Sequence, residues 1–258
     1  MSVSFEKLGN WGRIGNALHE IAATVGFAIK HGDNAVFPKW EYAEFFKNPI
    51  DQSLDPATIT RTYEEPHFHY AEIPYKPGLN LFGYFQSMKY WDHCQEEIKA
   101  LFEFREGLLT ETRDRLKINW QKPNIAVMVR RGDYVGNVNY INLKPEYYLK
   151  ALFKHFPDYL AFNIIFFSDD ITWCKENFGH LPNAKFAENN SCVEDLCLAS
   201  SCDHFILGNS SYHWWAAYLG QKPGSIIIRP SRVFDGPLKE KNDEKDFWKE
   251  DWTVMEIE

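Results

Sequence analysis

The segment Ile125–Val129, with the sequence IAVMV, is followed directly by Arg130–Tyr134, RRGDY. An unbroken apolar run of this length is typical of a parallel strand that is buried on both faces. The carboxyl ends of such strands form the edge at which open α/β sheets bind ligands. Two guanidinium groups at that edge suit a forked anion such as phosphate. The stretch therefore predicts a parallel α/β domain and a site for a phosphorylated ligand.

Downstream of Pro123 the sequence alternates apolar runs with segments of helical periodicity. This alternation predicts a three-layer domain with a parallel sheet. The charge-rich tail from Lys239, which contains two tryptophans, is expected to form a helix that lies back on the body. The expected strands are 125–129, 163–167, 205–207 and 225–228, and the expected helices are 145–155, 171–178, 193–202 and 211–219.

The N-terminal part predicts a second unit of loop, helix and strand. A glycine-rich turn at Gly12–Asn16 precedes a helical stretch over residues 17–30, with Gly32 as the expected stop, and a short strand follows at 34–38. The glycines are expected where the backbone turns sharply or approaches something closely.

The boundary between the two parts is expected near residues 117–122, after a second helical stretch over 92–115. This predicts an N-terminal domain of residues 1–120 and a C-terminal domain of residues 121–258.

Composition narrows the class of protein. The chain has 258 residues and a formal net charge of −8, which argues against a general binder of nucleic acid or of membrane surfaces. Its 5 cysteines show no metal-ligand spacing and are expected to be buried thiols in a reducing compartment. No secretory signal and no apolar run of about 20 residues is visible, so we expect a soluble, cytoplasmic protein without a transmembrane segment. No pattern indicates an oligomeric state.

Three of the expected strands end in polar clusters. Because the carboxyl ends of parallel strands share one edge, the three clusters are expected to converge there. Helices begin soon after the second and third clusters, so hydroxyls and unpaired helix N–H groups could meet a phosphate at that edge. The clusters are Arg130, Arg131 and Asp133; Ser168, Asp169 and Asp170; and Gly208, Asn209, Ser210 and Ser211.

Each cluster also has a purely structural interpretation. Asp169–Asp170 and Ser210–Ser211 could do no more than cap the helices that follow them. Arg130–Arg131 could form surface salt bridges. A metal at Asp169–Asp170 is not expected, because adjacent side chains point in different directions and no further acidic ligand is evident. His213, beside two tryptophans, is expected to be packed rather than catalytic.

Several segments together resemble glycosyltransferase family 11, the α-1,2-fucosyltransferases. Val129–Val135 resembles the family's His-x-Arg-Arg-Gly-Asp-Tyr motif, and the loop Gly12–Asn16 resembles its N-terminal glycine loop. The resemblance covers residues 8–220. The segments Gly83–Tyr90, Phe167–Cys174, Asp195–Cys202 and Asn209–Trp215 also agree with the family in order.

The resemblance implies an α/β, GT-B-like fold, in which two Rossmann-like domains face a cleft and the C-terminal domain holds a parallel sheet. It implies GDP-fucose as the donor, a galactose-terminated glycan as the acceptor and inversion at the sugar carbon. The product would carry fucose on the 2-hydroxyl of the terminal galactose. Neither a metal nor another cofactor is implied.

The same resemblance implies roles for individual residues. Arg130 would stabilise the leaving diphosphate, and Arg131 would support it or hold structure. Asp133 is the nearest candidate for the base that inversion requires, or else it orients Arg131. Asp195 would accept hydrogen bonds from a guanine edge. The expected substrate-binding residues are Arg13, Gly15, Asn16, Arg131, Ser168, Asp169, Asp195, Asn209, Ser210 and Ser211, and the expected acceptor contacts are Tyr84, Gln86 or Trp91.

One departure from the family pattern bears on the donor. Met128 stands where the family has histidine, and a thioether can pack against a ring but cannot donate a hydrogen bond. Two alternatives therefore stay open: a GDP-sugar-binding protein without catalysis, and a glycosyltransferase that uses another GDP-sugar such as GDP-mannose.

Overall fold

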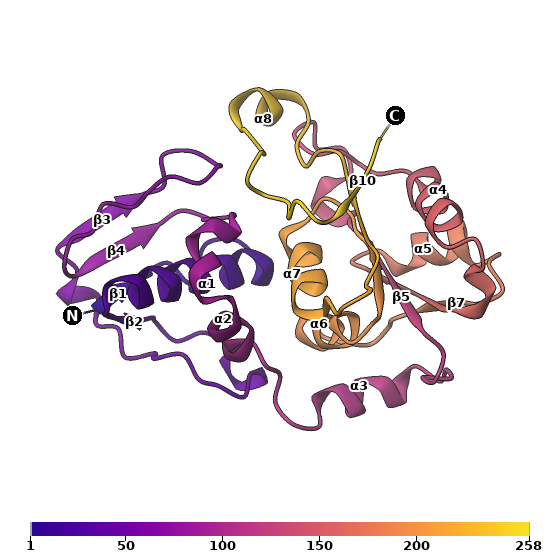
Figure 1. Ribbon diagram of the computed structural model, residues 1–258, viewed down its shortest axis with the longest axis horizontal. Coiled ribbons are helices and arrows are strands. Elements are labelled where there is room, and N and C mark those ends of the chain that lie inside the picture. The colour runs from indigo at the N-terminus through magenta and orange to yellow at the C-terminus, as the bar shows by residue number, and fades with distance from the viewer. Residues whose placement is uncertain (1, 258) are drawn as a thin grey trace. The chain divides into compact units, whose positions relative to one another are not determined.

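The computed structural model describes residues 2–257, which divide into two compact units (Figure 1). Unit 1 holds the residues up to 106 together with 242–249, and unit 2 holds 107–241 and the residues from 250 onward. The chain passes from unit 1 to unit 2 between residues 106 and 107, upstream of the domain boundary expected at 117–122. The reason is that the helix that ends at Arg115 packs with unit 2. Its guanidinium lies 2.7 Å from the carboxylate of Glu194. The cleft expected between the units stays a prediction.

Unit 2 is built on a six-stranded sheet in which every pair of neighbours is parallel. Along the sheet the order is β7-β6-β5-β8-β9-β10. When the strands are numbered along the chain, this is the order 3-2-1-4-5-6 of doubly wound sheets, whose ligand crevice lies where the order reverses. Here the reversal lies between β5 and β8. The strands are β5 (Asn124–Val129), β6 (Asn163–Ser168), β7 (Ala184–Phe186), β8 (His204–Ile206), β9 (Ile227–Pro230) and β10 (Thr253–Met255).

Helices cover both faces of this sheet. On one face a core cluster joins alternate residues of β5, Ile125, Val127 and Val129, to side chains of α4 and α5. α6 and α7 pack on each other, and α3 packs on α6 (Figure 1). The helices are α3 (Leu108–Arg115), α4 (Pro145–His155), α5 (Ile171–Phe178), α6 (Cys192–Ser200), α7 (Ser211–Gly220) and α8 (Gly236–Lys241), with single 3₁₀ turns at Gly132–Tyr134 and Tyr159–Ala161.

Unit 1 has its own four-stranded sheet, again parallel throughout, in the order β2-β1-β4-β3. The side chain of Asn80 ties its centre together, since Oδ1 accepts hydrogen bonds from the Ser4 hydroxyl and the Glu6 N–H. The elements are β1 (Ser2–Ser4), α1 (Ile14–His31), β2 (Asn34–Val36), β3 (Arg61–Glu64), β4 (Leu79–Phe82) and α2 (Gln95–Leu101), with 3₁₀ turns at Ala43–Phe45, Pro56–Thr58, Met88–Tyr90 and Asp92–Cys94.

One expectation about the helices needs correction and another is confirmed. The stretch 92–115 is not one helix, because it breaks after α2 and restarts at α3 behind Gly107, whose φ of +84° is left-handed. Gly32 does end α1, with a φ of +70°.

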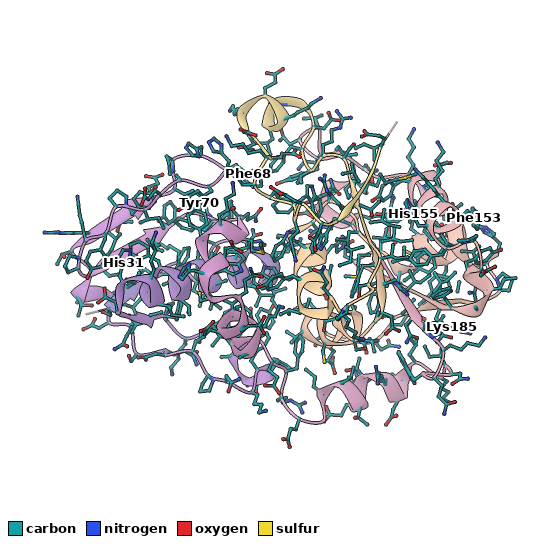
Figure 2. All side chains as sticks on the ribbon, in the orientation of Figure 1. His31, Phe68, Tyr70, Phe153, His155 and Lys185 are labelled. Carbon is teal, nitrogen blue, oxygen red and sulfur yellow. The ribbon has the colours of Figure 1, made fainter. Side chains whose placement is uncertain are left out.

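The C-terminal tail is not the single helix expected either. After the short α8, residues 242–249 return to unit 1, where the Asp246 carboxylate lies 2.5 Å from the Lys89 ammonium and accepts the Tyr70 N–H. Phe247 packs there against Phe68; Figure 2 labels Phe68 and Tyr70. The chain then adds β10 to the edge of the unit 2 sheet. Aromatic contacts with unit 1 and a ladder with β9 thus outweigh helix formation.

The cysteines mostly follow expectation. Cys94, Cys174, Cys197 and Cys202 are buried, whereas Cys192 is exposed at the start of α6. Within residues 2–257 no helix is long and apolar enough to cross a bilayer.

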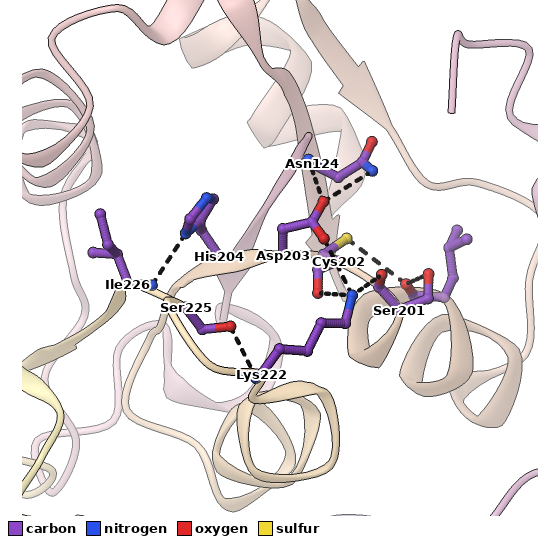
Figure 3. Close-up of polar contacts among 9 residues, drawn as sticks. Asn124, Ser201, Cys202, Asp203, His204, Lys222, Ser225 and Ile226 are labelled. Atoms are coloured by element: carbon purple, nitrogen blue, oxygen red, sulfur yellow. Dashed lines mark hydrogen bonds and ion pairs between the residues drawn. The ribbon is translucent and has the colours of Figure 1, made fainter. Parts of the chain in front are cut away.

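The amino end of the unit 2 sheet is fastened by an ion pair shown in Figure 3. The Asp203 carboxylate accepts the backbone N–H of Asn124 at 2.9 Å and lies 3.1 Å from the ammonium of Lys222. The same ammonium donates to the carbonyls of Ser201 and Cys202, just beyond the end of α6. Burial alone would raise the pKa of Asp203, but these hydrogen bonds outweigh it and hold the pKa below its usual value.

We expect Asp203→Ala to lower the free energy of unfolding by about 1–3 kcal/mol, because the N–H of Asn124, a residue only 4% exposed, loses its acceptor. Lys222→Ala should cost less, about 1 kcal/mol or below, since its ammonium sits on a side chain that is 51% exposed. Urea unfolding at pH 7 measures both. A larger loss for Lys222→Ala would contradict this ranking.

Candidate active site

Arg130, the first residue after β5, is held between two carboxylates. Its Nη2 contacts the Asp133 carboxylate, and its Nη1 lies 2.6 Å from Oδ2 of Asp169. The guanidinium also lies over the ring of Tyr134, 5.1 Å from the centroid. The side chain is 14% exposed, whereas that of Asp133 is 55% exposed. The cation is therefore largely enclosed, and Asp133 is the more accessible of its two partners.

Arg131 has a carboxylate of its own. Its Nε lies 3.1 Å from Oδ2 of Asp170, and its guanidinium lies 4.1 Å from the ring centroid of Trp173. Its backbone N–H donates to Oδ1 of Asp169. Asp133 therefore pairs with Arg130, and Asp170 pairs with Arg131. This differs from the expectation that Asp133 orients Arg131.

The register of the sheet explains these pairs. Val129 of β5 lies opposite Ser168 of β6. Continuing the chains by one residue brings Arg130 beside Asp169, and by two residues Arg131 beside Asp170. Asp170 also caps α5, because its Oδ1 accepts the N–H of Trp173. The capping interpretation therefore holds for Asp170, while Asp169 serves the two arginines instead.

Gly132 is required because the carboxylate of Asp169 approaches its backbone closely. A Cβ at Gly132 would lie 2.4 Å from Oδ2 of Asp169, and the φ of Gly132 is +23°. Any side chain here would push Asp169 away from Arg130, so the glycine of the RRGDY stretch keeps the ion pair compact.

The segment after β8 supplies the other side of the reversal point. The buried amide of Asn209 donates to the carbonyls of Ile141 and Val233, which fixes the loop before α7. The hydroxyl of Tyr134 reaches the Asn209 carbonyl at 3.4 Å and so links this loop to the one after β5. Ser210 caps α7 through the N–H of Tyr212.

Asp195 lies in the first turn of α6, next to the start of α7. The Tyr212 hydroxyl donates to the carbonyl of Cys192 at 2.6 Å, which brings the two helix starts together. Burial, with the charge of Glu194 adding to it, raises the pKa of Asp195 to about 6, and the hydrogen bond from Asn190 opposes this. In contrast, Arg115 and the capping box lower the pKa of Glu194 to about 2. The nearby Arg115 pairs with Glu194 rather than with Asp195, and its charge offsets only part of the rise in the pKa of Asp195.

Met128, at the position of the family's histidine, is completely buried within β5. The carbonyl of Met128 accepts the N–H of Gly208. The ring of His213 packs against the backbone of Gly208, where a Cβ would lie 2.9 Å from Nδ1 of His213. Burial lowers the pKa of His213 to about 3, and the charge of Arg130 adds to this. His213 is therefore a neutral packed residue, as expected, and Met128 shapes the packing beneath the site.

In unit 1 the predicted glycine loop connects β1 to α1. Arg13 is the exposed N-cap residue of α1 and makes no side-chain cap hydrogen bond, and Gly15 is buried in the first turn. Gly12 has a φ of +80°, and a Cβ there would lie 2.3 Å from Nδ2 of Asn16. Oδ1 of Asn16 accepts the Gln86 side-chain amide at 2.8 Å, which joins this loop to the one after β4.

The predicted residues therefore gather at two sheet edges. Arg130, Arg131, Asp133, Ser168 and Asp169 lie along the carboxyl ends of β5 and β6. Asn209, Ser210 and Ser211 follow β8, and Asp195 follows on the adjacent helix. The start of α1 in unit 1 holds the other three predicted residues, Arg13, Gly15 and Asn16.

Sequence reasoning missed two kinds of residue. Tyr134 and Trp173 supply the rings over which the arginines lie, although both stand inside the quoted motifs. Glu65 accepts the N–H groups of Tyr84 and Phe85 and thereby clamps the loop after β4. No motif marks Glu65, because its role comes from a partner strand distant in sequence.

Comparison with known proteins adds a family to this geometry. The family model described as glycosyl transferase family 11 matches residues 61–256, well over half of the chain. The chain belongs to glycosyl transferase family 11. This agrees with the resemblance drawn from the sequence motifs.

Relatives of this family 11 chain include bacterial and mammalian proteins. It is 32% identical to the O-antigen biosynthesis glycosyltransferase WbnK of Escherichia coli over 66% of the chain and 60% of that protein. It is 28% identical to an alpha-1,2-colitosyltransferase of Escherichia coli, over 62% of the chain and 58% of that protein. With galactoside alpha-(1,2)-fucosyltransferase 2 of Bos taurus the identity is 28%, over 81% of the chain and 67% of that protein. The chain thus spans about 60% of the length of the two bacterial relatives.

Solved structures share the fold of this family 11 chain. NodZ alpha-1,6-fucosyltransferase soaked with GDP-fucose matches with a TM-score of 0.54 at 12% identity, over 92% of this chain and 99% of that one. POFUT1 in complex with GDP matches with a TM-score of 0.55 at 13% identity, over 88% and 97%. The fold is therefore α/β and GT-B-like, as the resemblance implied, with the parallel sheet expected in the C-terminal domain and a second parallel sheet in unit 1.

We expect Asp195→Asn to alter the pH dependence of stability. The pKa of about 6 in the folded state lies above the ordinary value of 3.8, so the native state binds this proton more tightly. The free energy of unfolding should therefore fall as pH rises from about 4 through 6. The asparagine still accepts from Asn190 but carries no charge.

Urea unfolding at pH 4 and at pH 7.5 measures this effect. The variant should match the native protein at pH 4 and exceed it at pH 7.5. Equal differences at both pH values would show that the buried charge carries no cost.

Proposed function

We propose that the chain transfers fucose from GDP-fucose to the 2-hydroxyl of a terminal galactose of a glycan, with inversion and without a metal ion. Membership of family 11 and the names of the relatives support the reaction class. The observation that carries the proposal is the position of Arg130 at the carboxyl end of β5, beside the reversal of the doubly wound sheet. The cytoplasmic location expected from the sequence stays a prediction.

The chemistry asks for a cation at this place. As the bond from fucose to GDP breaks, negative charge grows on the diphosphate while the sugar becomes cationic. A guanidinium aimed at the leaving oxygen stabilises the transition state more than the ground state. Arg130 is enclosed and pre-oriented by Tyr134 and Asp169, so little reorganisation is needed during the reaction. Such a fork can replace the divalent cation that other glycosyltransferases use.

The diphosphate must compete with carboxylates for this fork. Both Nη atoms of Arg130 contact a carboxylate. We assign the exchange to Asp133, whose side chain is 55% exposed, and leave Asp169, at 26%, as the fixed support. A donor phosphate would take the position of the Asp133 carboxylate, which is an anion of similar forked shape.

The surrounding residues fit the rest of the donor. The start of α7 offers its first N–H groups and the hydroxyls of Ser210 and Ser211 to a phosphate. Asp195 has a pKa of about 6, so above that pH it is a carboxylate that can accept the N–H groups of a guanine edge. The loop Gly12–Asn16 of unit 1, at the start of α1, is a further candidate for the diphosphate.

A second donor is favoured by one observation. The alpha-1,2-colitosyltransferase is as similar to this chain, at 28% identity, as the bovine α-1,2-fucosyltransferase. Transfer of colitose, or of another sugar from a GDP donor such as GDP-mannose, is therefore the alternative. Competition among the GDP-sugars at equal concentration, read by the mass of the product, separates the donors. Binding of GDP without transfer to any galactoside would favour the non-catalytic alternative.

We expect Arg130→Lys to lower kcat by about 10²–10³-fold, because a single ammonium cannot reproduce the two-pronged contact. Steady-state rates with GDP-fucose and lactose measure this. Arg113→Lys is the matched control, since Arg113 also lies over an aromatic ring, that of Trp120 at 4.8 Å, but belongs to α3. Near-native turnover of Arg130→Lys would remove Arg130 from the mechanism.

Asp133→Asn separates the two roles open to Asp133. In an inverting transfer the base and the leaving group lie on opposite sides of the sugar carbon. A carboxylate in contact with Arg130 lies on the side of the leaving group, so we expect it to hold Arg130 rather than to accept the proton. The variant should keep kcat within about tenfold of native and bind GDP more tightly by calorimetry. A loss of about 10²–10⁴-fold in kcat with unchanged GDP affinity would identify Asp133 as the base.

A further inference from the structure

Unit 1 has a parallel sheet edge of its own. In its order, β2-β1-β4-β3, the strands β1 and β4 are parallel neighbours at the centre. The chain continues from the carboxyl end of β1 through residues 5–13 into α1, and from that of β4 into the loop Gly83–Gln86. In open parallel sheets ligands bind outside the carboxyl ends of the strands.

A platform of aromatic rings stands at that edge. The ring of Trp11 stacks on that of Tyr84, with centroids 5.7 Å apart and planes 29° apart, and lies 5.2 Å from the ring of Phe82. Trp11 is 40% exposed, which is unusual for so large an apolar side chain fixed between two neighbours. We call Trp11, Phe82 and Tyr84 the aromatic platform.

One strained loop, Gly83–Gln86, holds Tyr84 of this platform in place. Gly83 has a φ of +150° and Phe85 one of +49°, an uncommon conformation for a non-glycine residue. The Glu65 carboxylate, which follows β3, accepts the N–H groups of Tyr84 at 2.7 Å and Phe85 at 3.0 Å. A Cβ at Gly83 would lie 2.3 Å from the Cβ of Glu65, so only glycine lets the clamp close.

The opposite side of the platform is fixed as well. The hydrogen bond from Gln86 to Asn16 ties the loop that bears Tyr84 to the first turn of α1, which follows Trp11 in the chain. The strain in the loop Gly83–Gln86 persists because these polar contacts fix its backbone. Strain of this kind gathers at binding sites, where it keeps a surface pre-organised.

We propose that the aromatic platform binds the galactose ring of the acceptor by stacking on its apolar face. This inference rests on the proposed function, because it names the acceptor subsite of the same enzyme. A β-galactoside has an axial 4-hydroxyl, which leaves one face of the ring made of C–H groups at carbons 3, 4 and 5. An exposed indole stacked on a second ring matches that face.

The size of the platform supports a sugar over a protein partner. It consists of one exposed indole with two partly buried rings behind it, far less than the several hundred Å² of a protein-docking patch. A single pyranose covers an area of this order. The guanine of the donor is assigned to Asp195 of unit 2, so the platform is left for the acceptor.

Trp11→Ala tests the proposal through two independent measurements. The first is the KM for lactose at saturating GDP-fucose, which should rise roughly tenfold, the worth of one aromatic stacking contact. The second is saturation-transfer NMR with methyl β-D-galactopyranoside, whose signals at carbons 3 to 5 should be lost in the variant. Trp11→Phe, which keeps a ring, should restore part of both.

The control is Tyr75→Ala. Tyr75 is another exposed aromatic of unit 1, at 42%, and it stacks on His31 with centroids 4.3 Å apart, away from both loops. It should leave both measurements unchanged. Thermal unfolding verifies that each variant is folded.

The proposal is overturned if Trp11→Ala binds the galactoside as the native protein does, or if it weakens GDP binding instead. Failure of the proposed function has a different signature. The native protein would then bind methyl β-D-galactopyranoside at the platform but transfer no fucose to lactose.

Discussion

The ion pair between Arg130 and Asp169 is the interaction on which the rest of this site depends. It closes the carboxyl ends of β5 and β6, requires a glycine at position 132, and fixes the direction of the guanidinium. The pair is only partly enclosed, so its strength comes from geometry and from the Tyr134 ring more than from a low dielectric. A cation held in this way stays oriented when the accessible Asp133 exchanges for another anion.

Both units use the same construction. In each, a loop at the carboxyl edge of a parallel sheet is locked by a carboxylate that follows a neighbouring strand. In unit 2 that carboxylate is Asp169, which accepts the N–H of Arg131, and in unit 1 it is Glu65, which accepts two N–H groups. Each lies against a glycine that cannot be replaced without moving it. A repeated backbone solution thus serves a cationic surface in one unit and an aromatic surface in the other.

Much of unit 2 could be predicted from the sequence. α4 and α5 begin and end at the expected residues, because Pro145 and Asp170 mark their first turns and their apolar faces repeat with helical spacing. The strands β7, β10 and, in unit 1, β1, β3 and β4 could not, since segments of three or four residues show no readable period, whereas β2 lies within the strand expected at 34–38. β5 and β6 are continuous apolar runs without alternation, which leaves register unspecified by pattern alone. The convergence of the clusters followed from parallel topology, but the pairing of each arginine with its carboxylate depended on that register.

Charge sets a further condition on the donor site. Two guanidiniums at the edge of β5 and β6 face the carboxylates of Asp133, Asp169 and Asp170, so these groups have no formal excess of positive charge to offer a diphosphate. The additional attraction must come from groups that are not already neutralised. α1 and α7 have no acidic residue in the first turn, whereas α6 carries Glu194 and Asp195 there. Within unit 2 the positive end of α7 carries no carboxylate, whereas the start of α6 does, so α7 is the better place for an anion and α6 for a neutral ring that donates hydrogen bonds. This division agrees with the proposed GDP donor, whose diphosphate would meet α7 and whose guanine would meet α6.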